Sequence, residues 1–288
     1  VGSSTLFGLL LSEFSQVRLI QIIQGAAVVT MLLNIAALWK QEVRDPSRTQ
    51  GGGGQHFREA WRDFLAGGQA GRLLIALGLG TAGFNMQDIL LEPYGGQILG
   101  LSVGATTALT ALLAGGTLIA YGVAAHRLKR GADAYRLAAL GVLVGIAAFA
   151  AVIFAAPLES ALLFRLGAFL IGFGGGLFAV GTLTAAMDQV TAGQSGLALG
   201  AWGAVQASAA GLAIALGGVI RDFISGLATQ GHLGIALDTP ATGYGVVYHL
   251  EIGLLFATLI AIGPLAGTAC RPRQPTSARF GLAEFPGQ

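Results

Sequence analysis

The sequence predicts an all-helical protein that crosses a membrane several times, and three observations support that prediction. Only 10% of the 288 residues are charged, against about 25% in a soluble domain, and the mean hydropathy is +0.71. Seven apolar runs are each about 20 residues long, which is the length that a helix needs to cross a hydrocarbon layer of about 30 Å. The runs are continuous, whereas the strands of a membrane barrel alternate between apolar and polar residues.

The apolar runs set the order of the expected helices. They cover roughly residues 19–38, 73–92, 103–125, 137–156, 161–187, 196–220 and 245–267. A shorter apolar stretch at 1–11 lacks the basic region and cleavage site of a signal peptide. We interpret it as the end of a helix that begins outside the given sequence, and we expect the chain to be the C-terminal portion of a longer protein.

Basic residues predict the orientation of these helices. Thirteen of the 16 Lys and Arg residues fall in three segments, 40–72, 126–136 and 268–288. The positive-inside rule places these segments on the cytoplasmic side of an inner membrane. The linker and the C-terminus are therefore expected in the cytoplasm, and the intervening connections on the outer side.

The long segment 40–72 divides the chain. Its GGGG at 51–54 is typical of a flexible linker. The following FREAWRDFLAG has Phe57, Trp61 and Phe64 at helical spacing, which indicates a short amphipathic helix on the membrane surface. Six helices after such a segment is the arrangement of the second half of a major-facilitator fold.

We therefore predict a major facilitator-like helical bundle that contains the C-terminal six-helix half and the end of the N-terminal half. The predicted parts are the last one or two helices of the N-terminal half, the cytoplasmic linker with its amphipathic helix, the six-helix half and a cytoplasmic tail: 1–39, 40–72, 73–267 and 268–288.

Several function classes lack support in the sequence. The single Cys270 can form no internal disulfide, no Cys/His cluster has zinc spacing, and a net charge of +2 without a basic stripe does not favour nucleic acid. GLGTAG at 78–83 matches the dinucleotide fingerprint, but it lies inside an apolar run rather than between a strand and a helix. We find no nucleophile–base pair, and we predict that the protein is not an enzyme.

Small and polar residues within the runs predict helix contacts. GLALG at 196–200 and GFGGGLF at 172–178 allow helix backbones to approach closely in lipid. Gln206 lies in the middle of a run, where an interhelical hydrogen bond is the simplest expectation.

The stretch QDILLEPYGG at 87–96 places acids at the end of an apolar run. If one helix covers 73–92, then Asn85, Asp88 and Glu92 share one face of it, and Pro93 stops or kinks the chain. Two interpretations are open. The acids are either a polar helix end wetted by outer water or an acidic patch on a helix that faces a cavity.

Three further polar residues lie near the predicted outer boundary. Arg165 either pairs with Asp88 or extends to the interface. His249 is either hydrogen-bonded or a metal ligand, including a ligand for the magnesium of a chlorophyll-type pigment. Glu251 lies on the last helix, which usually faces lipid or a partner, and so indicates a contact with protein or pigment.

Nearly the whole chain resembles the PucC family of phototrophic bacteria, through RLIQIIQGAAVVTMLLNIAALWKQE (18–42), MQDILLEPYGGQILGLSVGATTALTAL (86–112) and GQSGLALGAWGAVQASAAGLAIALGGVIRD (193–222). QDILLEPYGG is the most specific of these stretches, since ordinary sugar or drug exporters do not carry it. The loop YGVAAHRLKRG at 121–131 lacks the usual acidic residue of the general facilitator loop, which disfavours an ordinary rocking transport cycle.

The resemblance implies a protein that assembles light-harvesting antenna complexes in a photosynthetic inner membrane and delivers or handles bacteriochlorophyll. The expected partners are antenna polypeptides, transiently bound bacteriochlorophyll, pigment-synthesis enzymes and membrane lipid. The candidate contacts with pigment or partner are the polar residues Gln87, Asp88, Glu92, Tyr94, Arg165, His249 and Glu251.

Two alternatives from other classes stay open. A secondary transporter that exports a small molecule or a pigment precursor would have a water-filled cavity and coupled protonation at Asp88 or Glu92. A structural subunit of a photosynthetic complex would stay bound permanently. The assembly function instead predicts apolar grooves, copurifying bacteriochlorophyll and transiently bound antenna polypeptides.

Overall fold

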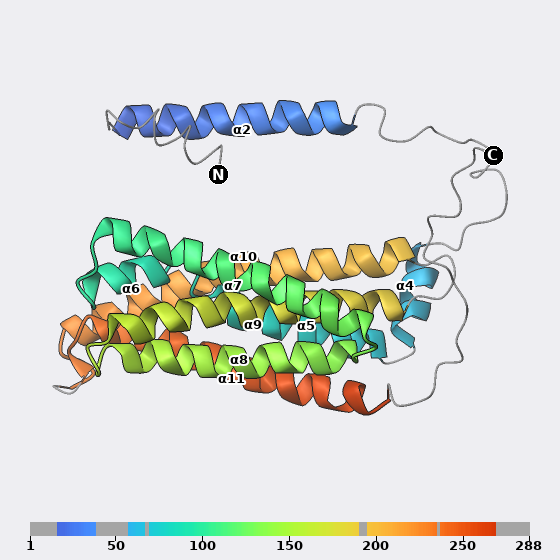
Figure 1. Cartoon of the computed structure of the whole chain (residues 1–288). Coiled ribbons are helices and arrows are strands. Elements are labelled where there is room, and N and C mark those ends of the chain that lie inside the picture. The colour runs from blue at the N-terminus through green and yellow to red at the C-terminus, as the bar shows by residue number, and fades with distance from the viewer. Residues whose placement is uncertain (1–15, 39–56, 67–68, 190–194, 235–236, 269–288) are drawn as a thin grey trace. The chain divides into compact units, whose positions relative to one another are not determined.

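A computed structural model describes residues 16–38, 57–66, 69–189, 195–234 and 237–268 (Figure 1). The helices are α2 (Gln16–Leu38), α4 (Phe57–Ala66), α5 (Gln69–Asn85), α6 (Leu91–Gln97), α7 (Val103–Lys129), α8 (Ala134–Ala155), α9 (Ala161–Asp188), α10 (Ser195–Thr229) and α11 (Ala241–Thr268). No strand occurs in these ranges. Six of the helices are long and apolar enough to cross a membrane. The predicted all-helical, multi-pass membrane protein is confirmed.

The chain forms two compact units that divide after residue 55, within the predicted linker. In the first unit the described residues form α2, whose 23 residues match the first predicted run. The second unit begins with α4, the short helix predicted from FREAWRDFLAG, in which the rings of Trp61 and Phe64 lie 6.0 Å apart. The remaining helices of this unit form a bundle.

Side-chain caps fix where three of the bundle helices begin. Ser102, Asp133 and Ser160 each have extended backbone and accept a hydrogen bond from the backbone N–H three residues later. Such caps satisfy amide groups that have no partner in the first turn of a helix. The polar residues between the apolar runs therefore define the helix boundaries.

Helix α9 lies at the centre of the bundle, against α7 on one side and α8 on the other. Helix α5 packs against α10 and α11, and α11 also contacts α8. In the most apolar part of α9, 56% of the residues are buried, against 11% in α10. Helix α10 therefore presents most of its surface outside the bundle.

Glycines allow the close contacts of α9. A side chain at Gly172 would collide with the backbone carbonyl of Leu113 on α7, and Gly174 lies against Gly141 on α8. These contacts confirm the packing predicted for GFGGGLF. In GLALG, by contrast, Gly196 and Gly200 meet no other described atom within 4 Å, so the close contact predicted there does not form among the described residues.

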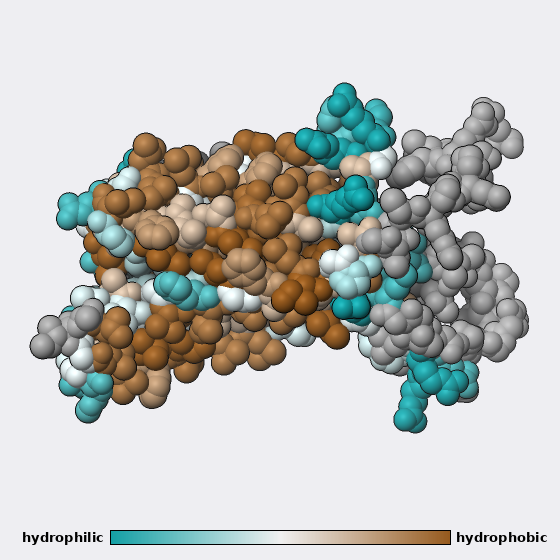
Figure 2. Space-filling model, turned by 90° about the horizontal axis from the view of Figure 1, so that it is seen from below, coloured by the Kyte–Doolittle hydropathy of each residue, from teal (hydrophilic) through white to brown (hydrophobic). Residues whose placement is uncertain are grey.

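The surface of the bundle matches a membrane environment. Figure 2 shows an apolar surface over most of the bundle's length, with hydrophilic residues gathered toward its two ends. One end carries α6 and the α8–α9 and α10–α11 connections (left in Figure 1), and we call it the predicted outer end.

The predicted helix over 73–92 is wrong in one respect. Helix α5 ends at Asn85, residues 86–90 form turns, and α6 begins at Leu91. Within the turns, the backbone N–H groups of Asp88 and Leu90 donate to carbonyls three residues back rather than four. The apolar run is therefore interrupted close to the predicted outer end.

Two amide side chains account for the interruption. Asn85 Nδ2 donates to the Thr81 carbonyl at 2.7 Å, and Gln87 Nε2 donates to the Phe84 carbonyl at 3.3 Å. Such local bonds compete with the helical backbone ladder. We predicted that Pro93 stops or kinks the chain where a helix ends at Glu92. In the structure Pro93 instead lies in the first turn of α6, where its missing N–H costs nothing.

Candidate functional site

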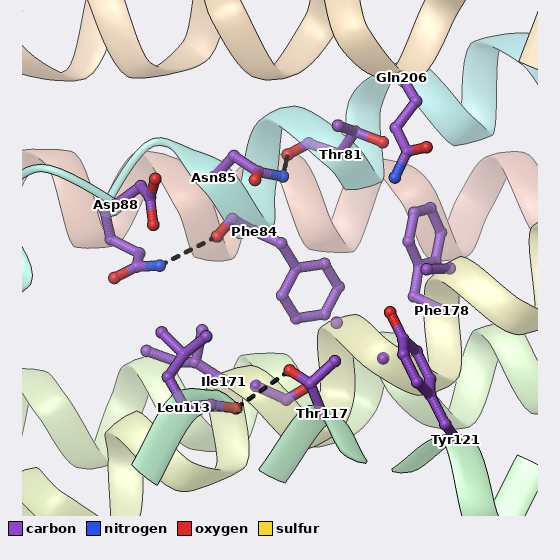
Figure 3. Close-up of a pocket in the computed structure, with 15 residues that line it drawn as sticks. Thr81, Phe84, Asn85, Asp88, Leu113, Thr117, Tyr121, Ile171, Phe178 and Gln206 are labelled. Atoms are coloured by element: carbon purple, nitrogen blue, oxygen red, sulfur yellow. Dashed lines mark hydrogen bonds between the residues drawn. The ribbon is translucent and has the colours of Figure 1, made fainter. Parts of the chain in front are cut away.

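A cavity of about 170 Å³ lies between α5, α7, α9 and α10, next to the interruption at 86–90 (Figure 3). Its walls include the aromatic rings of Phe84 and Phe178 and the glycine surface of α9. The polar lining residues are Thr81, Asn85, Gln87, Asp88, Thr117, Tyr121 and Gln206. The cavity therefore combines aromatic and polar groups, as binding sites for small molecules do.

Some of the polar groups in the cavity are occupied by the protein itself. Thr117 Oγ1 lies 3.0 Å from the Leu113 carbonyl and 3.1 Å from the Gly172 carbonyl. Gln206 and Tyr121 reach toward the aromatic rings from opposite sides (Figure 3). The interhelical hydrogen bond predicted for Gln206 is not formed among the described residues, so its amide is available to a ligand.

The two acids of QDILLEPYGG were predicted to share one helix face. They do not, because the helix is interrupted next to Asp88. Asp88 is exposed and lines the cavity together with Asn85. Glu92 is exposed on α6 and accepts a hydrogen bond from Thr110 of α7 at 2.6 Å. Of the two acids, Asp88 is the one that lines the cavity.

The predicted pairing of Asp88 with Arg165 is not formed. Arg165 is exposed on α9, and within the described ranges the ion pair found below 4.0 Å is Arg221 with Asp222, at 2.6 Å. Arg221 also donates to Gln97 at 3.0 Å and lies over the Tyr244 ring, 4.5 Å from its centroid. This contact between α10, α6 and α11 was not predicted, although Arg221 is one of three basic residues outside the segments that are predicted to be cytoplasmic.

Tyr94 anchors α6 in the bundle. It is 3% exposed, and its ring lies 5.5 Å from Phe164 of α9 and 5.3 Å from both Tyr244 and Tyr248 of α11. Edge contacts of this kind stabilise aromatic clusters beyond the area they bury. The Tyr94 side chain therefore serves packing in this conformation and does not meet an external partner.

His249 and Glu251 lie on opposite sides of α11. Residues two positions apart in the sequence differ by about 200° around a helix. In the structure His249 is exposed, whereas Glu251 is 0% exposed. Glu251 therefore points into the bundle and is not available to an external partner, contrary to the expectation from its place on the last helix. His249 faces outward.

The ring of His249 is held by its own helix. Its Nδ1 lies 2.7 Å from the Gly245 carbonyl oxygen, which can only accept, so Nδ1 carries the proton of the neutral ring and Nε2 keeps a free lone pair. Beside it is an open groove of about 450 Å³ lined by Val246, Leu250, Gly253 and Leu254. A free imidazole nitrogen above an apolar floor is suited to ligate a metal at the centre of a flat, apolar molecule.

A protein-held metal ion of the usual kind has no site in the described ranges, which contain no group of three or more His, Cys, Asp or Glu side chains able to hold one. A metal ion that binds to one of the described side chains would need its other ligands from the molecule that carries it. His249 supplies one donor nitrogen, which is what a metal already held in a macrocycle requires.

The fold and these sites define a multi-pass helical membrane protein with a polar inner cavity and an apolar outer groove beneath a histidine. The chain belongs to the PUCC protein family, whose sequence model matches residues 1–270. No solved structure matches it. The likeness to the major-facilitator fold therefore stays a prediction.

Relatives from phototrophic bacteria cover most of the chain. It is 51% identical to an uncharacterized protein in the puhA-bchM intergenic region of Rhodobacter capsulatus, over 99% of this chain and 60% of the relative. It is 52% identical to Protein PucC of Rhodovulum sulfidophilum, over 72% of this chain and 46% of the relative. A more distant relative, the bacteriochlorophyll synthase 44.5 kDa chain of R. capsulatus, is 28% identical over 93% of this chain and 61% of the relative. The chain thus spans about half to three fifths of these proteins.

Proposed function

We propose that the protein acts in the assembly of bacterial light-harvesting antenna complexes and handles bacteriochlorophyll and antenna polypeptides in the membrane. Membership of the PUCC family supports the assembly role, and the name of one relative refers to bacteriochlorophyll. The observation that carries the pigment part is His249, with a free Nε2 above the apolar groove of α11.

The residues around His249 fit such a pigment. A carbonyl that accepts from one ring nitrogen fixes the ring orientation and raises the basicity of the other nitrogen. Gly245 and Gly253 have open space above them, so a flat ring can approach the helix. Leu250 and Leu254 offer apolar contact to the ring on the same side.

Each of these residues has a separate part in the proposed site. The Gly245 carbonyl holds the His249 proton on Nδ1, and Nε2 binds the central magnesium of the pigment. The groove excludes water from one face of the ring because its lining is almost entirely apolar. The pigment itself supplies the light absorption that an antenna complex needs.

A second candidate function is export of a small molecule. The polar cavity between α5, α7, α9 and α10 supports it, because an aromatic and amide lining suits a small ligand within a bundle. The two candidates use different places on the molecule. The cavity faces Gln206 and Asp88, whereas the pigment groove is on the outside of α11.

Purification from the membrane of a phototrophic bacterium distinguishes the two. We expect the full-length protein to carry bacteriochlorophyll absorption and to copurify with antenna polypeptides during complex assembly, at lower levels once assembly stops. Pigment-free protein without antenna polypeptides would contradict the assembly function. Uptake of a labelled small molecule into vesicles that contain the protein, abolished by Gln206→Leu, would favour export.

A further inference from the structure

The charge in the inner cavity between α5, α7, α9 and α10 is negative. Among the described residues that line it, Asp88 has the one charged side chain, and none is Lys, Arg or His. Asp88 is exposed, and the described residues provide no ion-pair partner for it. The cavity wall therefore carries a carboxylate that a positively charged molecule could neutralise.

Two amide side chains add hydrogen-bond acceptors to the same wall. The NH2 group of Asn85 donates to the Thr81 carbonyl at 2.7 Å, and the NH2 group of Gln87 donates to the Phe84 carbonyl at 3.3 Å. Because a carbonyl oxygen can only accept, these bonds fix which end of each amide is left over. Asn85 Oδ1 and Gln87 Oε1 are therefore acceptors on the same turn of chain as the Asp88 carboxylate.

The side-chain oxygen of Gln87 is a buried polar atom without a partner. Gln87 is 3% exposed and lines the cavity, and its Oε1 makes no hydrogen bond. Such atoms are rare in proteins, and each one calls for an explanation. A bound molecule that donates a hydrogen bond would satisfy this oxygen.

Aromatic rings form another part of the wall. The rings of Phe84 and Phe178 lie 5.8 Å apart, with 37° between their planes. Tyr121 reaches toward these rings from the side opposite Gln206 (Figure 3). The face of an aromatic ring is negative and attracts cations, and it also covers apolar surface. The rings and the carboxylate therefore favour the same kind of ligand, an apolar molecule with a positive charge.

The volume of the cavity limits the size of this ligand. The cavity measures about 170 Å³, and a cavity of about 150 Å³ in another protein holds benzene. We propose that the cavity binds a small primary or secondary ammonium ion that carries an apolar or aromatic group. The ammonium group lies at Asp88 and donates to the oxygens of Asn85 and Gln87. The apolar group lies against the rings of Phe84 and Phe178.

This inference goes beyond pigment binding at His249. It rests on the cavity that supports the second candidate function, and it names the class of ligand for that cavity. Binding at equilibrium requires no transport. Protein that binds the ammonium ion but does not carry it into vesicles would contradict export and leave the ligand class in place, whereas a failure of pigment binding would contradict the His249 site alone.

Three probes of similar size and different charge test the ligand class. Benzylammonium, benzyl alcohol and benzoate are each titrated into the purified full-length protein near neutral pH, and the heat of binding is measured. We expect benzylammonium to bind saturably and benzyl alcohol to bind at least about tenfold more weakly, with benzoate weaker still. Benzyl alcohol or benzoate binding as tightly as benzylammonium would overturn the proposal. So would the lack of saturable binding of benzylammonium at millimolar concentration.

Two variants test where the ammonium group lies. Asp88→Asn keeps the shape of an exposed side chain and removes its charge, so this variant should fold. It should bind benzylammonium at least about tenfold more weakly and lose the preference over benzyl alcohol. The matched control Glu92→Gln alters the other acid of QDILLEPYGG, which accepts from Thr110 and does not line the cavity, and it should bind as wild type does. Wild-type affinity in Asp88→Asn, or an equal loss in both variants, would contradict the proposed site.

Discussion

The two faces of α11 differ in what surrounds them, although both are built mainly from apolar residues. The inner face is fully buried and follows a regular spacing of three and four residues: Tyr248, Glu251, Leu255, Thr258 and Ile262. The outer face is exposed and includes His249, Leu250, Phe256 and Ile260. The inner face carries Glu251 and Tyr248, and the outer face carries His249 at the groove.

The difference shows that position on the helix, rather than distance along the chain, decides what a polar residue can do. Glu251 is 0% exposed and is surrounded by protein. His249, only two residues earlier, is held by its own helix and is open to molecules from the membrane. Substitutions on the inner face should therefore affect folding, and substitutions on the outer face should affect binding.

The largest effect is expected from a buried positive charge. Glu251→Lys should destabilise the bundle by about 3–5 kcal/mol or more, because the position is 0% exposed and the cation would lose its water there. His249→Lys should fold, because its long side chain can reach the interface. The yield of monodisperse protein in size-exclusion chromatography measures both. Equal yields for the two variants would break the distinction between the faces.

Loss of a buried ring should have the next largest effect. Tyr248→Ala removes a side chain that contacts Tyr94 and Phe149, and it should cost about 3–5 kcal/mol. Leu250→Ala, on the outer face, should cost less than about 1 kcal/mol, since this side chain is 42% exposed. Reversible unfolding in mixed detergent gives both free energies. A Leu250→Ala cost as large as that of Tyr248→Ala would contradict the assigned faces.

Glycine positions provide the finest comparison. Gly243 faces α10, where an added methyl group would collide with Ser225 and the Arg221 backbone, so Gly243→Ala should cost about 1–3 kcal/mol. Gly253 has open space, and Gly253→Ala should leave stability unchanged or raise it by up to about 1 kcal/mol. Thermal unfolding of the two variants measures the difference. Similar losses in both would mean that Gly253 is also covered.

The order and type of the helices could be predicted from the sequence, because long continuous apolar runs have one stable arrangement in a membrane. The interruption at 86–90 could not, since polar residues near the end of a run also fit an unbroken helix that leaves the membrane there. It results from Asn85 and Gln87, whose side chains take backbone carbonyls from the helix. Those bonds depend on the local conformation, which composition does not reveal.

The candidate site was predicted in part. His249 was identified from its residue type, and the structure adds the Gly245 contact and the groove that favour ligation. Which way Glu251 faces could not be predicted, because α11 is apolar on both faces and has no polar side to orient it. Arg221 was missed because its partners, Gln97 and Tyr244, lie far away in the sequence.

The central claim, that His249 ligates pigment on the outer face of α11, is tested most directly by titrating bacteriochlorophyll into the purified full-length protein and following its absorption spectrum. We expect His249→Ala to weaken binding at least about tenfold and to lose the spectral shift of a ligated magnesium. The matched control His232→Ala alters an exposed histidine away from the groove and should bind as wild type does. Wild-type affinity and spectrum in His249→Ala would contradict the account.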